Sequence, residues 1–482
     1  MNTRSQSFIY LFIYFVCCIR IIGQSVFSHS EKLHPEILCN AAPIKAQDLL
    51  SKYIQFQSIS GEEKMAGEFL LSVCKSSGFY IRQFGDQNGN FNFIASLYPL
   101  DLKKPNILFL NHIDVVPAEE DQNWKYPPFG GIIDDGKIHG RGAYDNKGIA
   151  VMQLAAISAF VKLSRVSDLP FNVSLLSVSC EETMCEGGAR SVVEHHFEEL
   201  NAYALIGEGT PGLRGILDVK SSIPIFGIGI ACKSILWLQL ELEMFTSGHS
   251  SIPPINYANK QMILSLFHVI DKNQPFYYTT ENKQFLKSLG QQMGGFRGFI
   301  LDYPNTFKPF IRMHITKHPE IMSMFQNTIA LTGINSSCSV QNMIPSSISC
   351  LLDCRLLPDT DEHLFLSGLI KDLKQKEIAA KIIFKMPHSP VSSVEHPVYN
   401  IIRESIKEFY PNATVVPVVL PTGNDSGWFR AKGLACFDVL PFITDFQNLM
   451  TIHNANEYLS KKALEDGINI YMRFIQKMVN YD

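Results

Sequence analysis

The sequence has few charged residues, and neither sign of charge dominates. Among its 482 residues, 42 Lys and Arg stand against 46 Asp and Glu, which gives a formal net charge of −4. Proteins that bind DNA or RNA through the phosphate backbone present an excess of positive charge. We therefore expect no nucleic-acid partner.

A series of long hydrophobic runs is also missing. Only one apolar stretch approaches the length needed to span a membrane, which excludes a polytopic membrane protein. Hydrophobic residues make up 46% of the chain and charged residues 18%, which is typical of a globular protein and not of a disordered tail or a coiled coil. At about 150 residues per domain, the length indicates two or three domains.

The one apolar run lies at the start of the chain. It covers 8–19, follows Arg4 and is interrupted by Arg20. About a dozen residues are too few to span a bilayer comfortably, so we interpret 1–25 as a secretory signal peptide, with an uncleaved signal anchor as the alternative. We expect a secreted or lumenal protein, attached to the membrane if the leader is kept. The sequons at Asn172, Asn335 and Asn412 then become candidate glycosylation sites.

The eleven cysteines form no recognisable metal-binding or disulfide framework. Cys17 and Cys18 lie in the leader, and the chain has no CxxC pair and no Cys/His zinc spacing. Cys350 and Cys354 share one face of a single predicted strand, where an extended backbone holds them too far apart to bridge. We expect buried thiols, and the sequence leaves any disulfide pairing open.

Strands and helices alternate along much of the chain. Short apolar runs at 107–110, 171–178, 202–206 and 415–420 predict buried strands. Helices are predicted at 147–163, from 187 to about 200, and at 461–479. This order indicates an α/β fold with a largely parallel sheet covered by helices on both faces.

The middle of the chain follows another pattern. Leucines alternate with other residues from about 235 to 242, and 347–356 is similar, as in strands with one buried face. A helix at 362–376 and a strand at 380–384 follow. We therefore predict an inserted α+β domain at 232–388, which divides the sheet domain into 26–231 and 389–482.

Side chains that bind metals follow the predicted strands. In open α/β sheets, ligands bind beyond the carboxyl ends of the strands. The first strand leads to His112 and Asp114, the second to Glu181 and Glu182, and the third to Glu208. A loop places Asp145 just before a helix, and His453 comes near the C-terminus.

These residues together favour a metal centre over isolated structural roles. Glu181 and Glu182 place two adjacent negative charges after a buried strand, and a bound dication would relieve their repulsion. Imidazole and carboxylate ligands suit zinc, and two metals bridged by one carboxylate are a recurrent hydrolytic arrangement. Asp114 stands two residues from His112, where it can accept the other ring N–H and fix the tautomer.

At this point the sequence resembles the co-catalytic zinc metallopeptidase family of aminoacylase, carboxypeptidase G and yeast carboxypeptidase S. The resemblance covers the chain from about residue 45 to its end and is greatest to the secreted branch with carboxypeptidase S and the N-fatty-acyl-amino acid synthase/hydrolase. The motifs that carry it, in chain order, are His112-Ile113-Asp114-Val115-Val116-Pro117, Gly140-Arg141-Gly142-Ala143-Tyr144-Asp145-Asn146-Lys147-Gly148, Glu181-Glu182, Gly207-Glu208-Gly209-Thr210, Gly248-His249-Ser250-Ser251, Asn342-Met343-Ile344-Pro345, Asp353-Cys354-Arg355-Leu356-Leu357-Pro358 and His453.

The resemblance implies a role for each of these residues. Two zinc ions per active site would be bound, one by His112 and Glu208 and the other by Glu182 and His453, with Asp145 bridging them through a cis peptide to Asn146. Asp114 would orient His112, and Glu181 would be the general base that deprotonates the attacking water. His249 would stabilise the oxyanion, while Arg355 and Asn342 would hold a free carboxylate of the substrate.

The resemblance also implies an overall function. It predicts a ferredoxin-like lid that can form a homodimer, and a hydrolase that cleaves a peptide or N-acyl amide bond beside a residue with a free carboxylate. The alternatives are an aminoacylase or dipeptidase with small acyl groups, and a silent binding protein of the same fold. Cys180 stands where relatives often have an acidic or small residue, and Cys232-Lys233-Ser234 replaces a common Glu-Lys-Gly at the lid hinge. These departures leave the substrate side chain open.

Overall fold

The computed structural model describes residues 36–40, 42–85, 90–119, 123–164, 169–215, 223–245, 248–338 and 340–480. The predicted leader at 1–25 and its two cysteines lie outside these residues. Within the described part of the chain, no helix has both the length and the apolar composition needed to cross a membrane.

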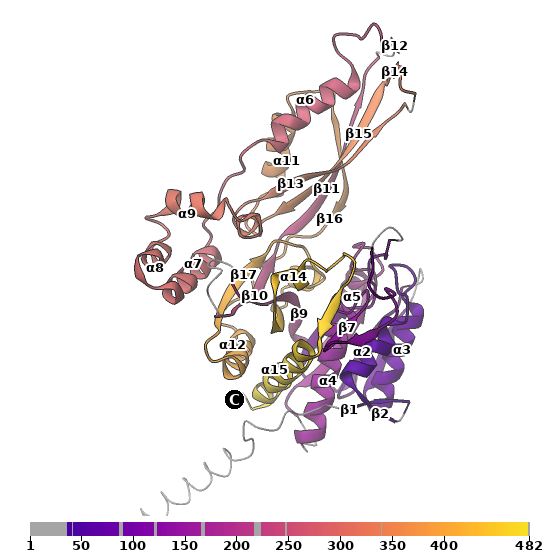
Figure 1. Ribbon diagram of the computed structural model, residues 1–482, viewed down its shortest axis with the longest axis vertical. Coiled ribbons are helices and arrows are strands. Elements are labelled where there is room, and N and C mark those ends of the chain that lie inside the picture. Colours follow the sequence, from indigo (N-terminus) through magenta and orange to yellow (C-terminus); the bar gives the residue numbers. More distant parts are fainter. Residues whose placement is uncertain are drawn as a thin grey trace, which may run out of the picture. The chain divides into compact units, whose positions relative to one another are not determined.

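A mixed eight-stranded sheet forms the centre of the fold (Figure 1). Its inner strands β18, β9, β5 and β8 run parallel to one another, as do β10 and β17, while the remaining neighbours are antiparallel. The predicted α/β fold with a mostly parallel sheet is therefore confirmed. In spatial order, the strands are β17 (Thr414–Leu420), β10 (Ile225–Cys232), β18 (Cys436–Thr444), β9 (Ala202–Leu213), β5 (Asn106–His112), β8 (Asn172–Val178), β4 (Asn92–Ser96) and β3 (Tyr80–Phe84).

Both faces of this sheet are buried under helices. Phe109 of β5 contacts the rings of Tyr471 and Phe474, whereas its neighbours Leu108 and Leu110 pack in a cluster with residues of the opposite layer. Because successive side chains of a strand point to opposite faces, each strand stabilises both layers. One layer contains α2 (Ala46–Ile54), α4 (Lys147–Ser164), α12 (Pro397–Phe409) and α15 (Lys461–Val479), and the other α5 (Ala189–His195) and α13 (Ser426–Ala431); α3 (Lys64–Ser76) follows α2.

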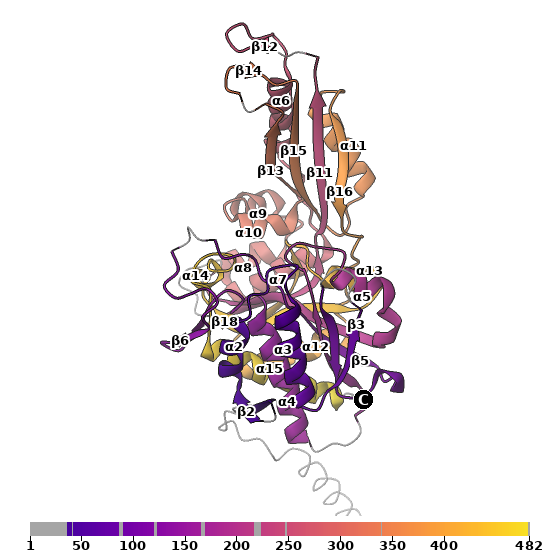
Figure 2. The same ribbon diagram turned by 90° about the vertical axis from the view of Figure 1, so that its right-hand side faces the viewer.

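A second, antiparallel sheet is built from the middle of the chain (Figure 2). Alternate residues of β11 and β15 are buried against α6 (Ala258–Ile270) and α11 (Glu362–Leu373), which explains the leucine alternation in the sequence. Cys350 and Cys354 lie on this buried face as free thiols. The strands in order are β13 (Thr328–Ser336), β15 (Ser347–Leu356), β11 (Ser234–Glu243) and β16 (Ala379–Lys385).

Four helices within the predicted insertion do not pack on this second sheet. They are α7 (Thr280–Met293), α8 (Gly295–Asp302), α9 (Lys308–Ile315) and α10 (Pro319–Met322). Leu286 and Leu289 of α7 join a cluster with Val416 and Val418 of β17, so these helices cover the edge strand of the central sheet. The segment 280–322 thus belongs by its packing to the sheet domain, and the remaining boundaries of the 232–388 domain stay a prediction.

A small three-stranded sheet links the Asp145 loop to the segment after His453. Its strands are β6 (Ile132–Asp134), β7 (Lys137–His139) and β19 (Tyr458–Ser460), and β19 pairs with β7. Segments more than three hundred residues apart in sequence therefore meet beside the site. The remaining elements are β1 (Glu36–Cys39), β2 (Ala42–Lys45), β12 (Gly248–His249), β14 (Met343–Ile344), α14 (Phe446–Leu449) and the 3-10 turns Leu100–Leu102, Phe197–Leu200 and Ser323–Phe325.

The structure corrects one of the three glycosylation expectations. Asn172 is only 1% exposed, and its side-chain amide donates a hydrogen bond to the carbonyl of Tyr98 at 2.9 Å. A buried, hydrogen-bonded amide cannot carry a glycan in the folded protein, so the prediction for Asn172 is wrong. Asn335 and Asn412 are exposed and stay candidates.

Candidate active site

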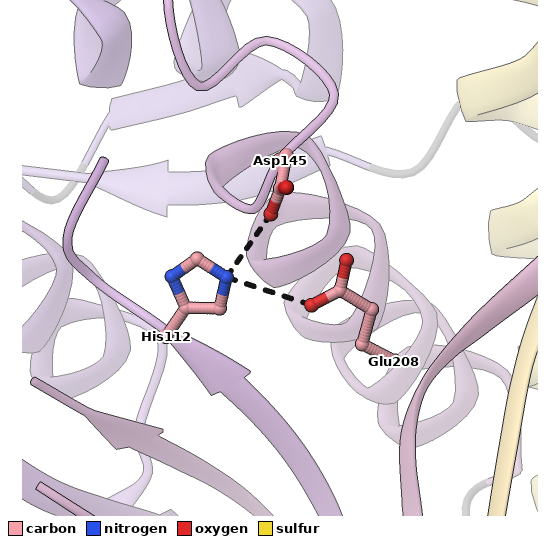
Figure 3. A group of neighbouring side chains, drawn as sticks. All are labelled: His112, Asp145 and Glu208. Carbon is pink, nitrogen blue, oxygen red and sulfur yellow. Dashed lines mark hydrogen bonds and ion pairs between the residues drawn. The ribbon is translucent and has the colours of Figure 1, made fainter. Parts of the chain in front are cut away.

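Three of the predicted metal ligands meet at the end of β5. His112 ends that strand, Glu208 lies within β9, and Asp145 lies in the loop before α4. The Nε2 atom of His112 is 3.0 Å from Oδ1 of Asp145 and 3.5 Å from Oε2 of Glu208 (Figure 3). One atom from each residue could therefore contact a single metal ion.

A second group shares Asp145 with the first. Nε2 of His453 lies 3.2 Å from Oδ2 of Asp145 and 3.1 Å from Oε2 of Glu182. The two oxygens of Asp145 thus face two different histidines, one in each group. This is the placement required of a carboxylate that bridges two metal ions.

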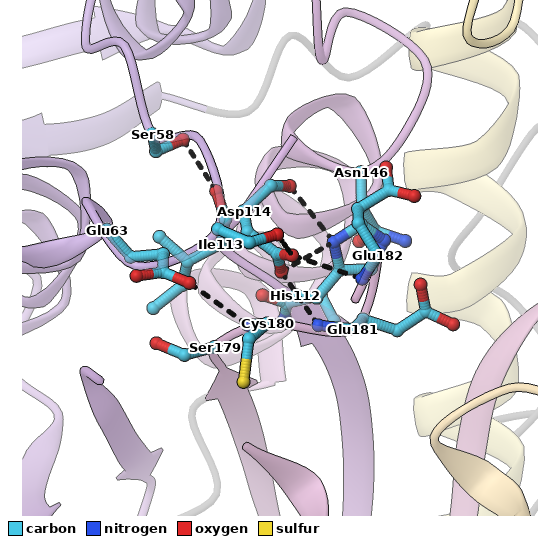
Figure 4. A network of polar contacts seen from close by, with 12 residues as sticks. Ser58, Glu63, His112, Ile113, Asp114, Asn146, Ser179, Cys180, Glu181 and Glu182 are labelled. Atoms are coloured by element: carbon cyan, nitrogen blue, oxygen red, sulfur yellow. Dashed lines mark hydrogen bonds and ion pairs between the residues drawn. The ribbon is translucent and has the colours of Figure 1, made fainter. Parts of the chain in front are cut away.

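Asp114 connects His112 to the loop with the paired glutamates. Its carboxylate lies 3.3 Å from Nδ1 of His112 and accepts the backbone N–H groups of Glu181 and Glu182 at 3.0 and 3.1 Å (Figure 4). The hydroxyl of Ser60 donates a further hydrogen bond to it at 2.6 Å. Asp114 is fully buried, so one fixed carboxylate orients both the imidazole and the glutamate loop.

A buried ion pair that the sequence analysis missed holds the backbone of Asp145. Glu457 accepts the backbone N–H groups of Tyr144 and Asp145 at 2.9 and 3.1 Å, and its other oxygen lies 2.7 Å from Arg141. The Asp145–Asn146 peptide bond is cis, as the resemblance implied. Arg141 was noted only within the glycine-rich motif, and nothing local in the sequence pairs it with Glu457, more than three hundred residues later.

Two asparagines, also without an assigned role, hold Glu208. The amide of Asn146 donates to its carboxylate at 2.7 Å, and the amide of Asn424 donates to its backbone carbonyl at 3.0 Å. Only Asn146 had a signal in the sequence, through its position next to Asp145.

The paired glutamates lie in a loop closed by a disulfide. Cys180 and Cys185 are joined, with Glu181 and Glu182 between them. The expectation of buried free thiols is therefore wrong for this pair. A turn brings the two cysteines together, although their spacing in the sequence is not that of a CxxC motif. Glu63 also holds the loop, since its buried carboxylate accepts the backbone N–H of Cys180 at 3.1 Å.

The ionisation of the site reflects its crowded carboxylates. Hydrogen bonds to Asp145 and Glu182 raise the pKa of His453 to about 10. Burial would lower the pKa of His112, but its hydrogen bonds to Asp114, Asp145 and Glu208 raise it well above the usual value. Burial and the charge of Asp145 raise the pKa of Glu182 to about 7, and burial raises the pKa of Glu181 well above its usual range.

The residues present fit a pair of cations. Oε1 of Glu182 is buried, and no described residue donates a hydrogen bond to it. Each group offers one imidazole and two carboxylates, a donor set that suits zinc and other divalent transition metals. A cation in each group would compensate the negative charge and give the unpartnered oxygen a ligand.

Two predicted lid residues lie together at the tip of the second sheet. The amide nitrogen of Asn342 is 3.3 Å from Nε2 of His249, in the short ribbon formed by β12 and β14. Both side chains are exposed. Figure 2 shows this ribbon at one end of β11 and β15.

Arg355 lies at the other end of the same sheet. It is paired opposite Ile235, close to the hinge, whereas β15 begins at Ser347, five residues after Asn342. The stretch of β15 from Ser347 to Arg355 alone spans about 26 Å at the usual strand rise. Arg355 and Asn342 of one chain therefore lie too far apart to hold the same carboxylate, and the expected clamp stays a prediction that would need one of the two residues from a second copy of the chain.

The guanidinium of Arg355 already has a partner. Its Nε and Nη2 atoms donate to the two oxygens of Asp353, each at 2.8 Å. Nearby, the buried Lys233 lies 3.4 Å from the hydroxyl of Thr328, and burial together with the charge of Arg355 lowers its pKa to about 7. The base of the lid thus has two basic side chains and one carboxylate.

The family model of the peptidase family M20/M25/M40 matches residues 108–477. The chain belongs to this family. It is therefore a metallopeptidase or amidohydrolase of the family, as the sequence resemblance predicted.

Individual relatives are distant but cover most of the chain. Probable carboxypeptidase S-like 2 of Dictyostelium discoideum is 23% identical over 81% of this chain and 75% of its own length. The mouse N-fatty-acyl-amino acid synthase/hydrolase PM20D1 is 25% identical over 78% of this chain and 74% of its own length.

Solved structures of the family share the fold. The M20 family metallo-carboxypeptidase Sso-CP2 from Sulfolobus solfataricus superposes with a TM-score of 0.68 at 20% identity, covering 90% of this chain and 99% of that one. The YXEP protein of Bacillus subtilis, described as a dinuclear metal-binding peptidase, superposes with a TM-score of 0.54 at 14% identity, covering 91% of this chain and 98% of that one.

Proposed function

We propose that this protein is a dizinc hydrolase that cleaves a peptide or N-acyl amide bond next to a residue with a free carboxylate. The observation that carries the proposal is the position of Asp145, whose two oxygens each face a histidine from a different ligand group. A carboxylate with a purely structural role would not require a separate group of metal-binding side chains beside each of its two oxygens.

Five residues would hold the metals. His112 and Glu208 would bind one zinc ion, Glu182 and His453 the other, and Asp145 both. The bound pair would supply Lewis acidity and would lower the pKa of water. The protein's part is to keep the ligands oriented, through Asp114 for His112 and through Glu457 for the backbone of Asp145.

Glu181 is the proposed general base. It follows Cys180 in the disulfide-closed loop and belongs to neither ligand group. Its carboxylate would take a proton from the attacking water and then deliver it to the leaving nitrogen.

Substrate recognition would need two subunits. Arg355 and Lys233 lie at the base of the lid, and their basic groups would contact the carboxylate of the substrate. His249 and Asn342 lie together at the opposite end of the lid, so we propose that they act at the site of a partner subunit in a homodimer, where His249 would stabilise the oxyanion.

The disulfide bears on localisation. Disulfides form and persist in oxidising compartments, and the pair Cys180–Cys185 lies directly beside the proposed base. This supports the proposal that the protein passes through the secretory route, with 1–25 as its leader.

A substrate panel separates this proposal from its alternatives. The enzyme would be assayed on dipeptides, N-acetyl amino acids and N-fatty-acyl amino acids, each as the free acid and as the C-terminal amide. We expect hydrolysis of the acids and little hydrolysis of the amides, because an amide lacks the carboxylate that Arg355 and Lys233 would contact. Preference for short acyl groups would favour an aminoacylase or dipeptidase. Zinc binding without turnover on any compound would favour a silent binding protein, and equal rates on acids and amides would contradict the carboxylate contact.

A further inference from the structure

A cavity lies among the helices that cover the edge strand β17. Its volume is about 400 Å³, within the usual range for small-molecule sites, and no proposed metal ligand, base or substrate-binding residue lines it. Residues of α7, α8 and α9 form its walls. The cavity is therefore separate from the candidate active site.

The helix arrangement that forms the cavity is fixed by close packing. Gly290 of α7 and Gly298 of α8 touch so closely that a Cβ atom on either would lie within 2.7 Å of a backbone oxygen of the other. The two glycines therefore hold α7 and α8 close together where they meet. Leu286 and Leu289, which line the cavity, belong to one cluster with Val416 and Val418 of β17. Apolar side chains of α7, α8 and α9 line the cavity, among them Phe285, Leu289, Ile300, Leu301 and Ile311.

The polar groups that line the cavity are all basic or imidazole side chains. They are Arg297, His314, Lys317 and His318, and no Asp or Glu lines the cavity. His318 lies 3.4 Å from Glu320, whereas Arg297 and Lys317 form no ion pair with any residue that the structure describes. Phe296, also part of the lining, is 75% exposed. The lining thus combines apolar walls with uncompensated positive charge.

From this combination, we infer that the cavity binds a fatty carboxylate, with the acyl chain between α7, α8 and α9 and the carboxylate against Arg297 and Lys317. Apolar walls stabilise a chain in proportion to the surface it buries, and a guanidinium is suited to a carboxylate. The inference does not depend on the reaction at the metal centre, because the two sites share no residue.

Dodecanoate is the probe for the test. We would titrate it calorimetrically into the full chain below its micelle concentration, beside decanoate and dodecanol. We expect one dodecanoate per chain, binding about fifteenfold weaker for decanoate from the loss of two methylenes, and at least tenfold weaker for dodecanol. Equal binding of dodecanoate and dodecanol would contradict the role of the basic residues.

Variants place the bound molecule. Leu301→Trp should fill the cavity and abolish binding, whereas Leu264→Trp, on an exposed position of α6, should not. If Leu301→Trp fails to fold, the surface variant Arg297→Glu should still weaken dodecanoate binding at least tenfold. Lys287→Ala, at an exposed position of α7 outside the cavity, is the control and should leave dodecanoate binding unchanged.

Two further results would overturn the inference. Binding that disappears when the metals are chelated but survives in Leu301→Trp and Arg297→Glu would place the fatty acid in the active site. If no binding occurs and Leu301→Trp instead dissociates a dimer in sedimentation, the cavity is an interface between two copies of the chain.

Discussion

The backbone N–H of Asp145 donates a hydrogen bond to the buried carboxylate of Glu457 at 3.1 Å. Through this contact, a residue near the C-terminus positions the carboxylate that the two ligand groups share. Glu457 itself is held by Arg141, and both side chains are almost completely buried. The proposed metal bridge therefore depends on an ion pair that contacts the backbone of Asp145 and not its carboxylate.

Replacing Glu457 should both destabilise the protein and weaken metal binding. Glu457→Gln leaves Arg141 as an uncompensated buried charge, which typically costs about 3 to 5 kcal/mol. Thermal unfolding and zinc content would be measured together. The control is Glu404→Gln, whose exposed pair with Lys477 is worth at most about 1 kcal/mol. Equal effects of the two variants would argue against a positioning role for Glu457.

The proposed base and the proposed ligands should respond differently to substitution. Glu181→Gln should retain its zinc but lose about a hundredfold or more in kcat, because the acceptor for the proton of water is gone. His453→Ala should lose metal from its group. Zinc would be counted by atomic emission on the purified proteins. Loss of zinc from Glu181→Gln to the same extent as from His453→Ala would show that the two roles are assigned wrongly.

The disulfide should stabilise the loop that contains Glu181 and Glu182. For a loop this short, the chain-entropy argument gives about 2 kcal/mol. Cys185→Ser should lower the free energy of unfolding by about that amount and reduce kcat, while hydrogen bonds from the loop to Asp114 and Glu63 limit the loss of structure. Cys338→Ser removes a free thiol and serves as control. Unchanged activity and stability in Cys185→Ser would show that the disulfide has no such effect.

Metal binding should release protons. The pKa of His453 is raised to about 10 and that of His112 well above its usual value, so both imidazoles are protonated in the metal-free protein at neutral pH. A ligand imidazole must be neutral, so metal affinity should fall as the pH falls, with about two protons released per chain by the imidazoles and a further fraction by Glu182, whose pKa is raised to about 7. Calorimetry in buffers with different ionisation enthalpies measures this number. A value near zero would mean that the histidines do not bind the metal.

Sharing of lid residues between subunits can be tested by mixing two inactive variants. His249→Ala and Glu181→Gln would be unfolded together, mixed equally and refolded. If His249 acts at the partner's site, a mixed dimer has one site with both residues intact, and activity should approach about a quarter of that of the wild type. Asn342→Ala should behave like His249→Ala in the same experiment. A mixed, zinc-loaded dimer without activity would exclude action in trans.

The secondary structure with a clear period was predictable. The amphipathic segment 461–479 and the alternating segment 347–356 have the same bounds in α15 and β15. Strand β4 was missed, because all five of its residues are buried and such a short run shows no period. The packing of α7 on β17 was missed for another reason: an amphipathic helix shows which of its faces is buried, but not against which strand.

Most candidate ligands were identifiable because they follow a predicted strand or precede a predicted helix in a recognisable motif, and His453 was identified through the family resemblance. The residues that hold them had no such signal. Glu457, Asn424 and Glu63 contact the site from segments far away in sequence, and single acidic or amide residues are common in loops. The Cys180–Cys185 pair was not predictable because it depends on the turn between its two cysteines.

The sequence by itself determined the order of strands and helices, the residue types at the strand ends and, through its motifs, the family. These are local properties, set by hydrophobic period and by residue identity at fixed spacing. The tertiary structure alone decided that the two oxygens of Asp145 face different histidines, and that Arg355 and Asn342 lie toward opposite ends of the second sheet. Both relationships are between residues that are not neighbours in the sequence. They are set by the pairing of strands in the folded sheets, which no local sequence pattern encodes.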